Sequence, residues 1–226
     1  MTVGFRILPC HRRVAKERVR SFSSLPVANV SDAMARMTAG GPRLRPMHDG
    51  SVLAGPAITV RTRPGDNLMF HKAIDLAEPG DVVVVDAGGD LTNALAGELM
   101  VAYAQRRGLA GFVINGAIRD ARAIRAGSFP VFAAGVTHRG PYKDGPGEIN
   151  VPIAIEGMVI QPGDLTLGDD DGVICVPFDH VSDVFLAASA KHEAEERQMQ
   201  AILAGNNSRA WVDRELARLQ CEVVGQ

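Results

Sequence analysis

Cysteine is scarce in this sequence. Among 226 residues there are three, Cys10, Cys175 and Cys221, and no two of them have the C-x-x-C spacing. A zinc knot or a disulfide framework is therefore not expected, and a reducing cytoplasm is the natural compartment for the protein. The apolar neighbours of Cys175 predict that it is a small core residue.

Long apolar runs and an excess of one charge are also missing. No run approaches the roughly 18 residues that a membrane-spanning helix needs, and the basic N-terminus lacks the apolar segment of a secretory signal. Lys and Arg number 24 against 26 Asp and Glu, a net charge of −2, whereas nucleic-acid binders usually carry a basic surface. We therefore expect a cytoplasmic protein that binds neither a membrane nor a nucleic acid.

Several catalytic signatures are absent as well. No loop has the G-x-G-x-x-G order or the Lys-Ser/Thr pair of a phosphate-binding loop, and no His pair has metalloprotease spacing. His71 and His138 are therefore interpreted as polar or capping residues. Ser182 and Ser189 lack the context of a nucleophile elbow. The run Asp169–Asp171 is bounded by glycines, which favours a solvated hairpin tip over a cation site.

The composition is typical of a folded protein, and the pattern of apolar runs predicts alternating strands and helices. Hydrophobic residues make up 46% of the chain, which excludes global disorder. The apolar runs Val82–Asp86, Gly111–Asn115 and Pro130–Ala134 predict buried strands, and segment 93–108 between the first two predicts a helix. Strands joined through helices usually pair in parallel. The sequence therefore predicts an α/β fold with a parallel strand–helix–strand centre.

Further elements surround this centre. Helices are predicted over 14–25, 30–37 with Ser31 as N-cap, 66–76, 180–204 and 211–219, and strands over 50–63, 149–155, 158–160 and 173–176. No linker or low-complexity stretch separates these parts. We therefore predict a single domain over residues 1–226, with a core of about 26–180 and a C-terminal helical arm of about 180–226.

Two loops follow the predicted central strands, at the end where parallel α/β folds bind ligands. Loop 86–90 contains Gly88 and Gly89, which either only shape a tight turn or present backbone amides to a small carboxylate or phosphate. The second loop ends in Arg119 and Asp120, which either pair on the surface or act as functional residues. In the functional interpretation, Arg119 offers a planar fork to a carboxylate, and Asp120 offers a hard oxygen ligand to Mg²⁺ or Mn²⁺.

Seven stretches together resemble one known family, and the likeness extends over about 30–205. They are Gly80–Asp86, Ala96–Met100, Gly111–Asp120, Phe129–Phe132, Asn150–Pro152, Gln161–Asp164 and Gly168–Val173. The family is that of the 4-hydroxy-4-methyl-2-oxoglutarate aldolases and the regulator of ribonuclease E activity A, the RraA-like family. The resemblance implies a β/β/α swivelling-type sandwich, assembled as a homotrimer or homohexamer with the site near a subunit interface.

The resemblance also implies a lyase activity. The family's enzymes are metal-dependent (class II) aldolases that cleave a 4-hydroxy-2-oxo dicarboxylic acid, such as 4-hydroxy-4-methyl-2-oxoglutarate, to pyruvate, and often decarboxylate oxaloacetate. By position in the motifs, Arg119 would bind the pyruvyl carboxylate and Asp120 would hold the divalent metal, Mg²⁺ or Mn²⁺. Residues Gly97, Glu98, Leu99 and Met100 would supply backbone amides to the 2-oxo acid substrate.

Two acidic positions would complete the catalytic set. Glu98 stands where the family usually has Asp or Glu. The family also places a glutamate from the C-terminal helix of a neighbouring subunit near the metal-bound water, and Glu195 is the best match, with Glu193 and Glu196 as alternatives. The pocket walls that would select a substrate are expected from loop 140–147 and from a neighbouring chain.

An alternative function within the family is a non-catalytic regulator that binds ribonuclease E or a related partner. Regulators of this kind typically lack the Asp of the Arg-Asp pair, and this chain keeps Asp120, which favours the enzyme. A quinone transferase is disfavoured because no Gly-rich cofactor loop is present. A Schiff-base (class I) aldolase is disfavoured because the predicted site loops contain no lysine, Lys72 and Lys143 being the nearest in sequence.

Overall fold

The computed structural model describes residues 3–38, 40–222 and 224. The chain divides into two compact units, Met1–Ser189 and Ala190–Gln226, and each is described by itself. Within the described residues, no helix has both the length and the apolar character to cross a membrane.

The strands and helices are distributed along the chain as follows. The strands are β1 Phe5–Ile7, β2 Arg45–Pro46, β3 Leu53–Thr62, β4 Val82–Asp86, β5 Ala94–Ala96, β6 Gly111–Ile118, β7 Val131–Val136, β8 Gly147–Ile149, β9 Ile153–Ile155, β10 Met158–Ile160, β11 Leu165–Asp169 and β12 Gly172–Val176. The helices are α1 Lys16–Phe22, α2 Val27–Ala33, α3 Leu68–Leu76, α4 Glu98–Arg106, α5 Ala121–Arg125, the 3-10 turn η1 Phe178–His180, α6 Val181–Leu203 and α7 Ala210–Arg218.

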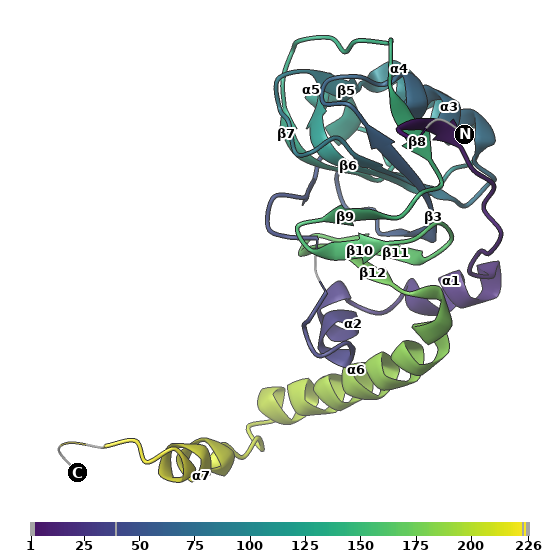
Figure 1. The fold of residues 1–226 in the computed structure, drawn as a ribbon. Coiled ribbons are helices and arrows are strands. Elements are labelled where there is room, and N and C mark those ends of the chain that lie inside the picture. The colour runs from purple at the N-terminus through teal and green to yellow at the C-terminus, as the bar shows by residue number, and fades with distance from the viewer. Residues whose placement is uncertain (1–2, 39, 223, 225–226) are drawn as a thin grey trace. The chain divides into compact units, whose positions relative to one another are not determined.

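The centre of the first unit is a parallel sheet. Strands β3, β4, β6 and β7 lie side by side in this order and run in the same direction. Helix α3 connects β3 to β4, α4 lies between β4 and β6, and α5 connects β6 to β7 (Figure 1). The predicted mixed α/β class with a parallel strand–helix–strand centre is therefore confirmed.

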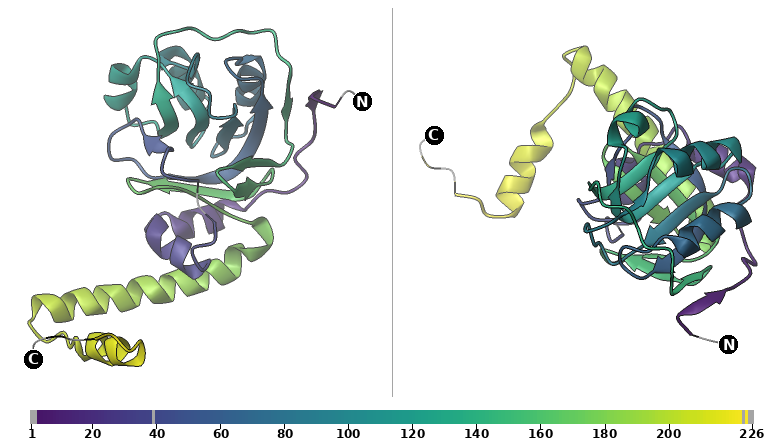
Figure 2. Two further views of the ribbon diagram at one scale, coloured as in Figure 1. Left: turned by 60° about the vertical axis from the view of Figure 1, so that its left-hand side comes forward. Right: turned by 90° about the horizontal axis from the view of Figure 1, so that it is seen from above.

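Alternate side chains of β4 pack into two different hydrophobic cores. Val83 and Val85 of β4 face a cluster formed with helices α3, α4 and α5, whereas Val82 and Val84 face a second layer that contains β9, β10 and β12. Since both faces of β4 are buried, its sequence is a continuous apolar run rather than an alternating one. Figure 2 shows the helices on one side of the parallel sheet and the additional strands on the other.

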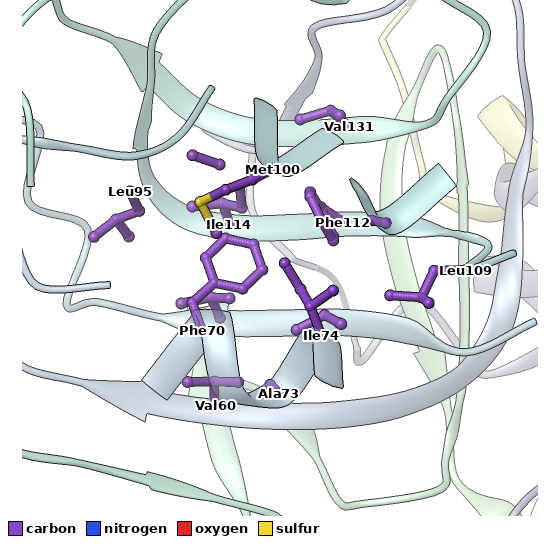
Figure 3. Packing of buried hydrophobic residues seen from close by; sticks show 14 of the residues in the cluster. Val60, Phe70, Ala73, Ile74, Leu95, Met100, Leu109, Phe112, Ile114 and Val131 are labelled. Atoms are coloured by element: carbon purple, nitrogen blue, oxygen red, sulfur yellow. The ribbon is translucent and has the colours of Figure 1, made fainter. Parts of the chain in front are cut away.

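The helical side of the sheet has an aromatic centre. The Phe112 ring of β6 lies 4.8 Å from that of Phe70 and 5.0 Å from that of Phe129, both edge-to-face, an arrangement that stabilises aromatic pairs. Figure 3 shows Met100 from the first turn of α4 in the same cluster, beside Phe70 and Ile114. The first turn of α4 is therefore anchored in the core.

Strand β3 links the two strand layers. Its first residues, Leu53–Pro56, pair antiparallel with β11, and from Ala57 onward it pairs in parallel with β4. A third cluster packs α1, α2 and the start of α6 against β11 and β12. Cys175 is buried in β12, as the sequence predicts, and burial raises the pKa of its thiol far above the ordinary value.

Several predicted elements have different bounds in the structure. Segment 93–108 is not one helix, because Ala94–Ala96 pairs with β6 as strand β5 and the helix begins at Glu98. Strand β6 continues to Ile118 instead of ending at Asn115. Strand β11 was not predicted at all.

The other corrections lie outside the central sheet. Ser31 is no N-cap, because α2 begins after Pro26 and ends at Ala33. The predicted strand 149–155 is interrupted at Asn150, whose φ of 58° is incompatible with a strand, and it forms the end of β8 and the whole of β9.

The second unit consists of helical segments. It contains the part of α6 from Ala190 onward and the whole of α7. Helices were predicted over 180–204 and 211–219, and the observed α6 and α7 agree with both within a few residues.

Candidate functional site

The candidate site lies at the carboxyl end of β6. Here the chain passes from Ile118 through Arg119 and Asp120 directly into α5. Because β5 pairs with the end of β6, the first turn of α4 lies beside this point. The two stretches border a cavity of about 250 Å³. Its lining residues are Asn67, His71, Ala94, Leu95, Ala96, Gly97, Leu99, Met100, Arg119, Asp120, Pro141 and Lys143.

Asp120 is held in place by its backbone and by α4. It has a φ of 57° and caps α5 from the left-handed region, which non-glycine residues rarely adopt. Its Oδ2 accepts a hydrogen bond of 3.0 Å from the N–H of Glu98 and lies 3.7 Å from Nε of Arg119. Oδ1 accepts no hydrogen bond from the described residues. With its side chain 42% exposed, Asp120 therefore offers one carboxylate oxygen to a ligand.

Gly97 makes this arrangement sterically possible. A Cβ atom at position 97 would collide with Oδ2 of Asp120 and would come within 3.1 Å of Cγ of Arg119. The φ of Gly97 is −152°, which any residue can adopt. The requirement for glycine here is therefore one of close approach and not of backbone conformation.

One backbone amide in the first turn of α4 is unused. The N–H of Glu98 donates to Asp120, and the N–H groups of Met100 and Val101 donate to the carbonyl oxygen of Gly97. Leu99 lies between them, and its N–H has no acceptor among the described residues. A free N–H at a helix N-terminus favours an anion. The Leu99 amide and the Arg119 guanidinium both border the cavity, so both are suited to a carboxylate.

Three polar residues of the cavity come from other parts of the chain. Nδ2 of Asn67 donates to the carbonyl of Leu95 at 2.8 Å, and its Oδ1 lies 3.3 Å from Nζ of Lys143. The two predicted site loops contain no lysine, but Lys143 of loop 140–147 borders the cavity. The motifs around Arg119 carry no signal for Asn67 or Lys143, although loop 140–147 was expected to form a pocket wall and supplies Lys143.

Buried Asp66 holds loop 140–147 against the start of α3. Its Oδ2 accepts the N–H groups of Asp144 and Gly145 at 2.7 and 2.8 Å, and its Oδ1 accepts the N–H of Leu68 at 2.9 Å. Lys143, next to Asp144, is thereby placed beside the first turn of α3.

His71 is the third of these polar residues. Burial lowers the pKa of its imidazole below the ordinary value of 6.5, the ammonium of Lys143 lowers it further, and Asp75 partly opposes both effects. Each cause follows from the cost of placing a positive charge in a poorly solvated position near another cation. The imidazole is therefore neutral at pH 7 and can accept a proton.

Other predicted candidates lie outside this cavity. The N–H groups of Gly88 and Gly89 donate to Oδ1 of Asp86 and to the carbonyl of Asn115. They are therefore unavailable to an anion, and the tight-turn interpretation of loop 86–90 is the correct one. At the tip of the β11–β12 hairpin, Asp169 accepts the N–H of Val27.

The glutamates of the C-terminal helix belong to the second unit. Glu195 lies on α6, with an Oε1 3.0 Å from Nζ of Lys191, and Glu193 and Glu196 have partners one turn away on the same helix. No group of three or more His, Cys, Asp or Glu residues suited to a metal ion occurs in the described part of the chain. The metal role of Asp120 and the catalytic roles of Glu98 and Glu195 remain predictions.

Comparison with known proteins identifies the family. The family model for RraA-like proteins, described as Aldolase/RraA, matches residues 27–175. A protein of Halalkalibacterium halodurans that bears the name "Putative 4-hydroxy-4-methyl-2-oxoglutarate aldolase" is 42% identical over 184 residues, which are 81% of this chain and 88% of that protein.

Two solved structures have a similar fold. An uncharacterized protein from Pseudomonas syringae pv. tomato has a TM-score of 0.77 at 28% identity, and the match covers 86% of this chain and 96% of that one. The RNA-processing inhibitor RraA from Thermus thermophilis has a TM-score of 0.62 at 30% identity, with 67% and 92% covered. The cavity between α4 and the end of β6 thus lies within the matched segment, and the chain belongs to the RraA-like family.

Proposed function

We propose that this protein is a divalent-metal-dependent aldolase. Its substrate would be a 4-hydroxy-2-oxo dicarboxylic acid such as 4-hydroxy-4-methyl-2-oxoglutarate, which it would cleave to release pyruvate, and it would also decarboxylate oxaloacetate. One observation carries the proposal: the Arg119 guanidinium, the Asp120 carboxylate and the free amide of Leu99 border the same cavity. The relative from Halalkalibacterium halodurans supports the same reaction class.

The residues around Asp120 fit a magnesium-like ion. Mg²⁺ commonly binds to proteins through one or two carboxylates and keeps several waters, so the single carboxylate Asp120 with an uncommitted Oδ1 is a sufficient protein ligand. When bound, such an ion supplies Lewis-acid polarisation of the 2-oxo group and stabilises enolate charge. The hydrogen bond from Glu98 to Oδ2 fixes the orientation of the carboxylate.

Arg119 and Leu99 would orient the substrate. Cleavage of the C3–C4 bond leaves its electron pair on the pyruvyl half as an enolate, while the C4 hydroxyl loses its proton and becomes a carbonyl. A carboxylate bound by the guanidinium and the amide keeps the reacting bond in one orientation. Both groups are positive in character and therefore also favour the charge that develops.

The proton of the C4 hydroxyl needs an acceptor. Neutral His71 borders the cavity and is one candidate. Glu195 is a second candidate, through the resemblance to enzymes in which a neighbouring subunit supplies a glutamate. Glu98, which is exposed at the start of α4, is a third. The activities of His71→Gln, Glu98→Gln and Glu195→Gln distinguish these candidates, because only the substitution of the base should remove most of the turnover.

Lys143 suggests how a dicarboxylate would be accommodated. Its ammonium would bind the second carboxylate, because Lys143 borders the same cavity as Arg119. The same lysine is the residue to test for Schiff-base chemistry. Treatment with borohydride in the presence of pyruvate should leave the mass of the protein unchanged, and a reduced adduct on Lys143 would show that the class II assignment is wrong.

The decisive experiment is a coupled assay for pyruvate. Activity on 4-hydroxy-4-methyl-2-oxoglutarate should appear with Mg²⁺ or Mn²⁺, disappear with EDTA and return when the metal is restored. Asp120→Asn should abolish it, while Asp49→Asn, at an exposed aspartate outside the cavity, should keep wild-type activity. Full turnover in EDTA, or by Asp120→Asn, would refute the proposal.

A second candidate function is a non-catalytic regulator of ribonuclease E or a related partner. The similarity to the Thermus thermophilis protein named as an RNA-processing inhibitor favours it. It predicts that the protein binds the ribonuclease and lowers its rate, with no turnover of any 2-oxo acid. The presence of Asp120 makes the aldolase the preferred proposal.

Three further expectations stay proposals. A homotrimer or homohexamer with the site near an interface is supported by Leu99, which borders the cavity and is 82% exposed. The layering of helices, parallel sheet and additional strands supports a β/β/α swivelling-type sandwich. The scarcity of cysteine supports a cytoplasmic location.

A further inference from the structure

A second cavity lies at the opposite end of the parallel strands. It has a volume of about 340 Å³ and is bordered by α1 with the residues before it, by the start of β3 and by the turn that leads into β4. Asp81 of this turn immediately precedes β4, and Val82 is in register with Gly111 at the start of β6. Asp120 follows the other end of β6, so this cavity is separate from the candidate active site.

The walls of the second cavity are mainly apolar. They are formed by Val14 and Val19 on one side, by Ala54 and Pro56 of β3, and by Pro79 of the turn. The volume falls within the range of about 300–1,000 Å³ that is typical of small-molecule sites, which usually combine apolar walls with a few polar groups.

The charged groups of this cavity divide into a paired and an unpaired set. Nη1 of Arg13 lies 2.8 Å from Oε1 of Glu78 and 3.3 Å from Oδ2 of Asp81, so this arginine forms an ion pair with both carboxylates and leaves one negative charge among the three groups. Lys16 and Arg20 also border the cavity and form no ion pair with the described residues. They are four residues apart on α1 and therefore lie on the same face of that helix.

We propose that this cavity binds a small organic anion with an apolar body. The carboxylate of the ligand would lie between the ammonium of Lys16 and the guanidinium of Arg20, and its apolar part would pack against Val19, Ala54 and Pro56. Three cations, Arg13, Lys16 and Arg20, border the cavity together with two carboxylates, Glu78 and Asp81. The lining therefore has one positive charge in excess, which favours an anion. The apolar walls select an organic ligand over a fully hydrated inorganic ion.

Benzoate and its neutral isostere benzamide are suitable probes. Methyl NMR spectra of the full chain report separately on the two cavities, through Val14 and Val19 in the second and Leu99 in the first. Benzoate should shift the Val14 and Val19 signals in a saturable manner, and benzamide should bind at least about tenfold more weakly, as expected for the loss of a charge-assisted hydrogen bond.

Two variants and one control test the assignment. The double substitution Lys16→Gln and Arg20→Gln should weaken benzoate binding by about tenfold or more, and Ala54→Leu should block the cavity to both probes. Arg18→Gln, at an exposed arginine of α1 that does not border the cavity, should bind benzoate like the wild type. Equal affinity for both probes, shifts confined to Leu99, or an unchanged double variant would overturn the proposal.

Discussion

At the scale of single residues, the site depends on the close approach of Gly97 and Asp120. The carboxylate of Asp120 occupies the space that a side chain at position 97 would need, and it uses that proximity to accept the N–H of Glu98. The position of the proposed metal ligand is therefore determined by the absence of one methyl group.

Gly97→Ala tests this dependence. The new methyl group must displace the Asp120 carboxylate, and a displacement of about 1 Å in an active site can reduce the rate about 100-fold. We expect kcat/KM for pyruvate release to fall by about that factor while the circular dichroism spectrum is unchanged. Gly127→Ala is the control, because a Cβ there approaches its nearest neighbour, a backbone oxygen, at 3.4 Å. Wild-type activity in Gly97→Ala would contradict the steric argument.

His71 gives a prediction for pH dependence. Its pKa is lowered mainly by burial and then by Lys143, so an NMR titration of its ring should give a midpoint below 6.5. If His71 is the base, kcat should decrease on the acid side with this same midpoint, and His71→Gln should remove that decrease along with most of the activity. A titration midpoint at or above 6.5 would contradict a partly buried imidazole near the ammonium of Lys143.

The lowered pKa of His71 also makes the free energy of unfolding depend on pH. Because the folded pKa lies below the unfolded value, the unfolded chain binds a proton first as the pH falls below about 6.5. The free energy of unfolding therefore decreases with falling pH until the folded imidazole is also protonated. In His71→Gln this part of the pH dependence should be absent.

At the scale of elements, the first strand is attached to the sheet through a buried carboxylate. The side chain of Glu148 in β8 is fully buried and forms ion pairs with Arg6 of β1 and Arg61 of β3. Burial raises its pKa, but hydrogen bonds from the Gly4 amide, Arg61 and Arg6 outweigh this effect and bring the pKa below its ordinary value of 4.5.

Glu148→Gln should therefore destabilise the protein at neutral pH. Removing one partner of a buried charged network costs about 1–3 kcal/mol, measurable by urea unfolding at pH 7. Since the folded pKa is depressed, the stabilisation exists above about pH 4.5 and is lost as the pH falls through the folded pKa. The difference between wild type and variant should shrink there. Glu17→Gln, at an exposed glutamate, should show no such difference.

Elements that depend on local composition could be predicted from the sequence, and those that depend on pairing could not. The run Val82–Asp86 is β4 to the residue, because its first four positions are all buried and require apolar side chains. Ala94–Ala96 consists of good helix formers and becomes a strand only through pairing with β6. The start of α4 at Glu98 places the N–H groups of Glu98 and Leu99 at the site. This start follows from the pairing of β5 with β6, and the local sequence does not indicate it.

At the scale of the whole molecule, the site joins segments that are distant in sequence. Arg119 and Asp120 were predicted from their adjacency and from a family motif. Asn67 and Lys143 were not, because their side chains meet only when loop 140–147 folds against α3. Glycine-rich loop 86–90 has the composition of an anion site, but its amides are consumed by hydrogen bonds within the fold.

The oligomeric state can be predicted at this scale. The cavity is bordered by the exposed side chain of Leu99, and the proposed function includes a glutamate supplied by a neighbouring subunit. Light scattering coupled to size exclusion should give a mass of about three or six times the 24.0 kDa of one chain. A stable monomer with full activity would contradict a site completed by a neighbouring subunit.

The most direct test of the account is a crystal structure with Mn²⁺ and oxalate, a planar analogue of the pyruvate enolate. The account predicts an anomalous peak of Mn²⁺ within about 2.2 Å of Oδ1 of Asp120, with one oxalate carboxylate bound by Arg119 and by the amide of Leu99. A metal peak away from Asp120, or oxalate bound outside the cavity between α4 and β6, would contradict it.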